Sequence, residues 1–122
     1  MSTHDDILNS LRNERAAIEA ELNESRARLG DAKAALAEAE ATRDRAASDR
    51  AGRRAATAPL GAATASRLAR WRDGANQAAY QAEGAVSLAR AVVFNCQHDL
   101  ETLETALRQI VGLLADPAEA AV

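Results

Sequence analysis

The chain has 122 residues, a formal net charge of −3 and 48% hydrophobic residues. More than half of those hydrophobic residues are alanine and only 2% of the chain is aromatic, so a β-sandwich, a barrel or a doubly wound sheet fits poorly. A single cysteine excludes an internal disulfide framework. Abundant alanine, glutamate, leucine and arginine are typical of long helices and coiled coils.

A heptad repeat predicts a first helix over residues of about 4–56. Asp5 and Asp6 place negative charge in its first turn, where the helix dipole favours it. Apolar residues then recur at two positions of the heptad, and large side chains dominate as far as Leu36. The repeated positions are Leu8, Leu11, Arg15, Ile18, Leu22, Ser25, Leu29, Ala32, Leu36, Ala39, Arg43, Ala46 and Arg50.

A turn at about 57–61 follows, because Pro59 removes a backbone donor and Gly61 tolerates unusual backbone angles. Apolar periodicity resumes over about 62–115, which predicts a second helix, and residues 116–122 are expected to fray. The seam of this second helix is formed by Leu68, Ala75, Ala82, Ala89, Cys96, Leu103 and Ile110.

The glycines inside these helices leave open a compact bundle of four shorter helices, because each one weakens a helix. The heptad phase nevertheless continues through Gly30 and Gly74, which favours two long helices. The predicted fold class is therefore all-α: a single domain over 1–122 that forms an antiparallel helical hairpin of coiled-coil type. An alanine-rich seam buries little apolar area, so the hairpin is expected to form a homo-oligomer, a dimer or higher, as a helical bundle.

The second helix has the wider apolar stripe, so it is expected to contact another copy of the chain as well. Polar residues around Asn95 interrupt this stripe and are expected to set the register between copies. The predicted self-association face consists of Val92, Val93, Leu100, Leu103, Leu107, Ile110 and Leu114.

Charge is distributed in three blocks along the chain. Residues 1–42 carry a net charge of −4, residues 43–72 carry +6 and residues 73–122 carry −5. The positive block brackets the predicted turn, which points to an acidic partner: a protein surface, a larger assembly, a neighbouring copy or nucleic acid. Solvation of the arginines alone stays open as an alternative. This predicted docking surface, the arginine tip, consists of Arg43, Arg45, Arg50, Arg53, Arg54, Arg67, Arg70 and Arg72.

Three isolated residues invite a functional interpretation that their surroundings do not support. Trp71 lies among arginines and is suited to stack on bases, but its position favours a role at the end of the apolar stripe. Cys96 and His98 form a lone pair, whereas structural zinc needs four ligands. No nucleophile–base arrangement, phosphate-binding loop or ligand cluster is present in the sequence, so we expect no enzyme, cofactor or metal site.

The leading functional prediction is a structural or interaction protein that docks onto a larger assembly. A phage particle component (capsid decoration, head or tail assembly) and a secretion-system accessory are its concrete forms. The alternatives are a nucleic-acid-associated protein that uses the arginine tip, and a helical adaptor or chaperone for a client helix. No secretory signal or membrane span is recognisable, which predicts a cytoplasmic or virion location.

Overall fold

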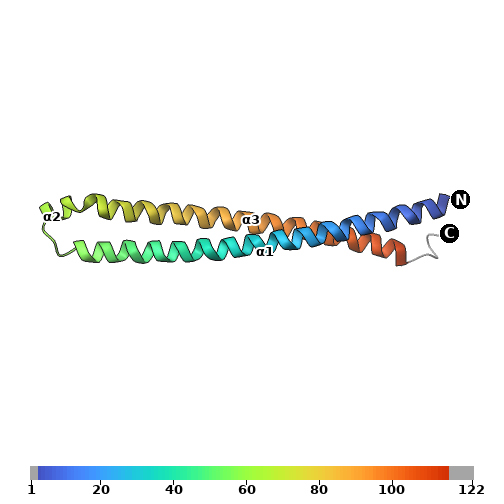
Figure 1. Cartoon of the computed structure of the whole chain (residues 1–122), viewed down its shortest axis with the longest axis horizontal. Coiled ribbons are helices and arrows are strands. Elements are labelled where there is room, and N and C mark those ends of the chain that lie inside the picture. Colours follow the sequence, from blue (N-terminus) through green and yellow to red (C-terminus); the bar gives the residue numbers. More distant parts are fainter. Residues whose placement is uncertain (1–2, 116–122) are drawn as a thin grey trace. The chain divides into compact units, whose positions relative to one another are not determined.

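The computed structural model describes residues 3–115, and within that range no strand occurs. Helix α1 spans Thr3–Thr57, helix α2 spans Ala62–Arg67 and helix α3 spans Ala69–Ala115. The two long helices, α1 and α3, pack against each other (Figure 1). The all-α class and the two long helices are thereby confirmed in place of four shorter ones. The predicted frayed tail lies outside the described residues.

Two compact units share these helices. One consists of the chain up to Asp31 together with the chain from Phe94 onward, and the other is Ala32–Val93. We call them the terminal unit and the turn unit. In each of them a stretch of α1 lies beside a stretch of α3 that runs in the opposite direction (Figure 1). The single domain over 1–122 stays a prediction, as does oligomerisation.

The heptad positions of α1 supply the core of the terminal unit. Ile18, Leu22 and Ser25 are 7%, 2% and 3% exposed, and they are spaced four and three residues apart. The opposing stretch of α3 contributes side chains that are only half-buried. These are Cys96, Leu100, Leu103, Leu107, Ile110 and Leu114. A spacing of three and four residues keeps both rows facing each other along the pair of helices.

Ser25 is the polar exception in this core, and its replacement by alanine is expected to stabilise the protein. Its hydroxyl has no hydrogen-bond partner among residues 3–115, and serine is a weaker helix former than alanine. We expect Ser25→Ala to raise the free energy of unfolding by about 1 kcal/mol in urea titrations followed by circular dichroism. Ser10→Ala, at an exposed position of the same helix, should gain only about 0.5 kcal/mol from helix propensity. A loss at Ser25 would instead show that its hydroxyl stabilises the fold.

The core of the turn unit is built mainly from alanine. Ala75, Ala79 and Ala82 on α3 are 2%, 4% and 7% exposed, followed along the same seam by Val86 and Val93 at 1% and 9%. Small side chains let two helices approach closely, but they remove little apolar surface from water. The seam of this unit therefore depends on small side chains that pack closely.

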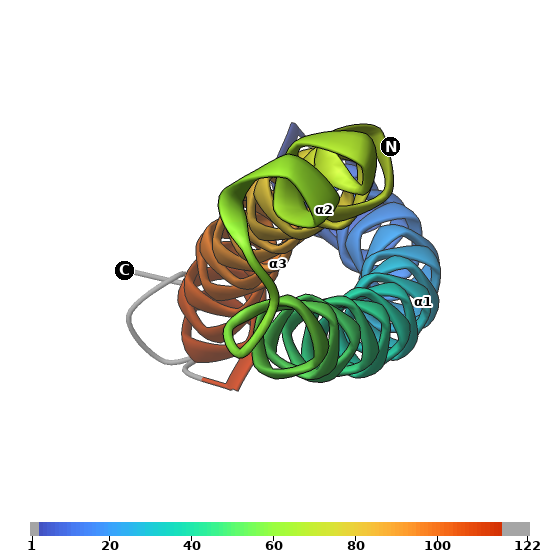
Figure 2. The ribbon, with the colours of Figure 1, turned by 90° about the vertical axis from the view of Figure 1, so that its left-hand side faces the viewer.

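The connection between α1 and α2 forms where the sequence predicts a turn. The amide of Leu60 donates to the carbonyl of Thr57 at 3.1 Å, and Thr57 itself is 5% exposed. Viewed end-on, the connection leaves the end of α1 and crosses to α2, which precedes the start of α3 (Figure 2). Gly61 adopts a φ of −64° and needs no glycine-specific backbone angle.

The predicted second helix is interrupted at one residue. Leu68 has φ −94° and ψ 3°, outside the α-helical range, and it separates α2 from α3. Neither α2 nor α3 has an acidic residue in its first turn, and Arg70 opposes the dipole at the start of α3, whereas Arg67 lies in the last turn of α2. Thr64 and Ser66 also lower the helix propensity of this segment. The interruption is mild, since the Leu68 amide still donates to the carbonyl of Thr64 at 3.2 Å.

Candidate functional site

All eight residues of the arginine tip belong to the turn unit. They lie on the last turns of α1, on α2 and on the first turns of α3. Two of them have neighbours along their own helix that use their donors. The Nε of Arg43 lies 3.3 Å from Oδ1 of Asp44, and Arg45 donates to the hydroxyl of Thr42 at 3.2 Å. These are short-range contacts on one helix, which contribute little to stability when exposed.

Arg53 differs because it connects α1 to α3. Its guanidinium lies 3.1 Å from Oδ2 of Asp49 and donates to the backbone carbonyl of Trp71 at 2.6 Å. It also lies over the indole ring of Trp71, 4.9 Å from the ring centre, which is within the range of a cation–π interaction. Arg53 therefore holds the two helices together near the turn. From the sequence, this residue was expected to belong to the docking surface instead.

Trp71 is placed by this contact rather than by the apolar stripe. Its side chain is 42% exposed, so it does not close the end of the seam as the sequence suggested. One face of the indole is taken by Arg53. That contact leaves a single ring face for any further stacking partner.

The side chains of the remaining arginines of the tip have no hydrogen bond or ion pair among residues 3–115. These unpaired residues are Arg50, Arg54, Arg67, Arg70 and Arg72. Like charges on one part of a surface repel one another, and the repulsion falls as salt rises. An acidic partner would relieve that repulsion, so this group is the strongest candidate binding surface in the turn unit.

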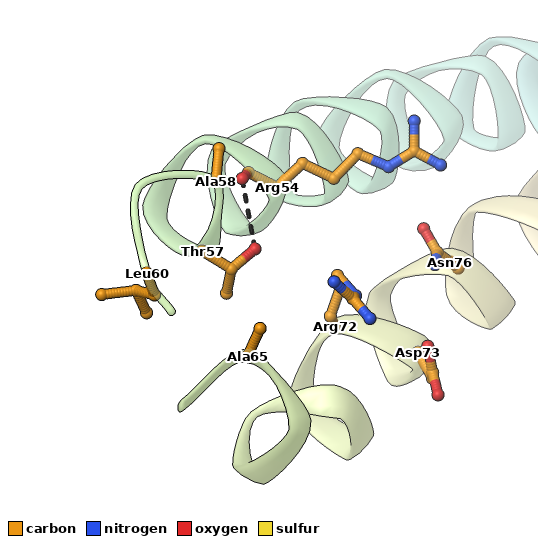
Figure 3. Close-up of a pocket in the computed structure, with 8 residues that line it drawn as sticks. All are labelled: Arg54, Thr57, Ala58, Leu60, Ala65, Arg72, Asp73 and Asn76. Carbon is orange, nitrogen blue, oxygen red and sulfur yellow. Dashed lines mark hydrogen bonds between the residues drawn. The ribbon is translucent and has the colours of Figure 1, made fainter. Parts of the chain in front are cut away.

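Two of the unpaired arginines border a cavity of about 640 Å³ between the end of α1 and the start of α3. Figure 3 shows the Arg54 side chain extended along α1, with Arg72 on α3 across from α1 and Asn76 further along α3. Asp73 is directed away from Arg54 in this view and forms no ion pair with either arginine. The cavity is lined by Arg54, Thr57, Ala58, Leu60, Ala65, Arg72, Asp73 and Asn76.

The cavity also contains an acceptor without a donor. Oδ1 of Asn76 is buried and has no hydrogen-bond partner, whereas buried polar atoms in proteins are nearly always paired. The hydroxyl of Thr57 is already used, since it donates to the carbonyls of Arg53 and Arg54 at 3.0 and 3.2 Å. Because Oδ1 of Asn76 is itself inaccessible, the groups of this lining that favour a negatively charged occupant are the guanidinium groups of Arg54 and Arg72.

The predicted self-association face is largely turned toward α1. In the terminal unit Leu100, Leu103, Leu107, Ile110 and Leu114 are half-buried along the seam, as described above. In the turn unit Val93 is 9% exposed, and Val92 alone among the seven is mostly open, at 51%. Asn95, which was expected to set the register between copies, is exposed. Six of the seven residues thus pack within the hairpin.

The remaining residues that drew attention in the sequence form no site. Cys96 is a free, half-buried cysteine on the seam, and His98 is exposed. Among residues 3–115 no group of three or more histidine, cysteine or acidic side chains is arranged to hold a metal ion. No helix in the same range combines the length and apolar character that a membrane crossing needs.

Sequence reasoning missed a second exposed feature on α3 of the turn unit. Tyr80 and Leu88 are 82% and 72% exposed, although both belong to an apolar-rich helix. Counting in sevens from Leu68 and from Arg72 gives the two heptad positions of the seam. Tyr80 and Leu88 belong to neither series, so this count would have marked them as apolar residues outside the seam. Three features therefore distinguish the turn unit: arginine side chains without a partner, a cavity that two of them border, and exposed apolar side chains.

Fold and surface together define a class, an antiparallel helical hairpin with a basic turn. No protein family, curated protein or solved structure matches this chain.

Proposed function

We propose that the chain is a non-enzymatic interaction protein that docks its arginine tip onto an acidic surface of a larger protein assembly. The observation that carries this proposal is the group of five tip arginines without a partner, two of which border the same cavity. Arginine binds carboxylates through a planar fork of donors, which gives both affinity and orientation. Arg54 and Arg72 are the residues we assign to the first contact.

Two features favour an acidic protein over nucleic acid. The whole chain carries a net charge of −3, whereas nucleic-acid-binding domains are usually basic overall. The sequence also carries no recognisable nucleic-acid-binding motif.

Self-association belongs to this proposal, since an alanine-rich pair of helices gains stability from a further layer of packing. A phage particle component, for capsid decoration or for head or tail assembly, and a secretion-system accessory are the assemblies we consider. A cytoplasmic or virion location follows from either. These forms rest on the composition and on the docking surface.

Binding of a labelled polyglutamate peptide, followed by fluorescence anisotropy, tests the proposal. We expect the double variant Arg54→Ala/Arg72→Ala to weaken binding about tenfold, which corresponds to about 1.4 kcal/mol. The matched control is Arg26→Ala/Arg28→Ala, which removes the same charge from exposed, unpaired arginines of the terminal unit. It should weaken binding less than about twofold, because only the net charge changes.

Binding of labelled duplex DNA, measured in the same way, tests the nucleic-acid alternative. Tighter binding to DNA than to polyglutamate, with an affinity that falls steeply as salt rises, would overturn the proposal in favour of a nucleic-acid-associated protein. Equal losses in the tip variant and its control would also count against it, since the charge would then act without a defined site.

A further inference from the structure

Helix α3 of the turn unit has an apolar surface that α1 does not cover. Tyr80, Leu88 and Val92 are 82%, 72% and 51% exposed, whereas the seam that contacts α1 lies on the other side of the helix. We call this surface the outer face. It consists of Tyr80, Gly84, Ala85, Leu88, Ala91 and Val92, all of which are exposed.

The spacing of these residues makes them a continuous row. Tyr80, Gly84, Leu88 and Val92 follow one another at intervals of four, and residues four apart are neighbours on a helix surface. None of the six carries a charge. Single exposed apolar residues are ordinary, but a row of large ones on one uncharged face is typical of an interaction surface.

Gly84 has a special place in this row. A Cβ atom built on it would meet no atom within 4 Å, so packing inside the chain does not require a glycine there. It lies one turn from a large exposed apolar side chain on each side, Tyr80 and Leu88. Glycine weakens a helix relative to alanine, but it lets a partner helix approach closely.

We propose that a second copy of this chain packs antiparallel across the outer face, with Leu88 of each copy seated over Gly84 of the other. In this arrangement a two-fold axis passes beside Val86. A residue that precedes Val86 in one copy then lies opposite the residue that follows Val86 by the same number of positions in the other copy. It therefore pairs Leu88 with Gly84 and Val92 with Tyr80. A two-fold interface must be complementary to itself, and this register places a large side chain opposite a small one.

The charges at the edge of the outer face select the same orientation. Glu83 and Arg90 are seven residues apart, so they lie on the same side of α3, between the outer face and the seam that contacts α1. The antiparallel register brings Glu83 of one copy within one residue of Arg90 of the other. A parallel pair would instead place Glu83 beside Glu83, and like charges disfavour that orientation.

This inference specifies a surface for the self-association included in the proposed function. It differs from the face predicted from the sequence, of which only Val92 is shared. The docking proposal concerns separate residues, so polyglutamate binding by the arginine tip can succeed or fail without regard to the outer face.

Sedimentation equilibrium of the full chain tests the inference. We expect a dimer whose dissociation constant rises at least about tenfold in Leu88→Glu, because a charge then faces Gly84 of the second copy. Leu113→Glu is the matched control: Leu113 is 58% exposed on α3 of the terminal unit, and its replacement should change the dissociation constant less than about twofold. Circular dichroism verifies that both variants remain helical.

Charge reversal then tests the register. Glu83→Arg and Arg90→Glu should each weaken the dimer about threefold, and the double variant Glu83→Arg/Arg90→Glu should restore it, because the pair is exchanged. A monomer at all concentrations would overturn the inference. A dimer that tolerates Leu88→Glu would overturn it as well, while self-association through another surface would stand. Weakening by Leu88→Glu without restoration by the double charge reversal would overturn the antiparallel register.

Discussion

Replacing Leu22 by alanine is expected to lower the free energy of unfolding by about 2–4 kcal/mol. Leu22 is 2% exposed, and with Val86 it is one of the two largest fully buried side chains among residues 3–115. The variant loses the transfer free energy of the removed atoms and leaves a cavity that a pair of helices fills only in part. Small domains have only about 5–15 kcal/mol of stability in total, so the loss is a large fraction.

Thermal unfolding followed by circular dichroism at 222 nm measures this effect. For a chain of this size each kcal/mol lowers the melting temperature by about 4 °C, so we expect a decrease of roughly 8–16 °C. Leu113→Ala is the control, because the same atoms are removed from a side chain that is 58% exposed in the same unit. It should cost less than about 0.5 kcal/mol. Equal losses at the two leucines would contradict the assignment of Leu22 to the core.

The large-scale fold could be predicted because it depends on periodicity. Ile18, Leu22 and Ser25 were placed on the seam by counting heptads, and all three are buried. The turn was predicted from Pro59 and Gly61, whose effects on the backbone are local. Such effects involve only a few neighbouring residues, so they can be recognised in the sequence before the tertiary structure is known.

The interruption at Leu68 was not predicted, because no single residue there breaks a helix. It arises from several weak terms together: Thr64 and Ser66 favour helices poorly, and no acidic residue offsets Arg70 at the start of α3. Each term is a fraction of a kcal/mol, and apolar periodicity passes through the segment unchanged. Periodicity alone therefore overstates the continuity of the second helix.

The arginine tip could be located from the sequence, but its members could not be separated by role. All eight arginines look alike in a charge count, yet Arg53 contacts Trp71, eighteen residues away, and the side chain of Arg54 next to it has no hydrogen bond or ion pair among residues 3–115. That difference depends on which side of α1 faces α3, and on the register between the helices. The outer face was missed for the same reason, since the second helix was treated as a single wide stripe.

Replacing Arg53 by alanine is therefore expected to destabilise the turn unit by about 2 kcal/mol, whereas replacing Arg54 should not. The Arg53 variant loses the hydrogen bond to the Trp71 carbonyl, the contact with the indole ring and the ion pair with Asp49. The first two connect different helices across the turn, so their loss frees the ends of α1 and α3 from each other. Arg54 has no hydrogen bond or ion pair of its side chain among residues 3–115.

Hydrogen exchange of backbone amides separates the two roles. In Arg53→Ala we expect exchange to accelerate around the turn, and Trp71 fluorescence to report greater solvent exposure of the indole. Arg53→Lys should rescue only part of the loss, because lysine keeps the charge but not the planar fork of donors.

Arg54→Ala should leave exchange and stability within about 0.5 kcal/mol of the unmodified chain while it weakens polyglutamate binding. Destabilisation by Arg54→Ala comparable to that of Arg53→Ala would assign the whole arginine tip to holding the turn together and would remove the basis for a docking surface. Stability that is retained in Arg54→Ala and lost in Arg53→Ala would leave the unpaired arginines free for an acidic partner.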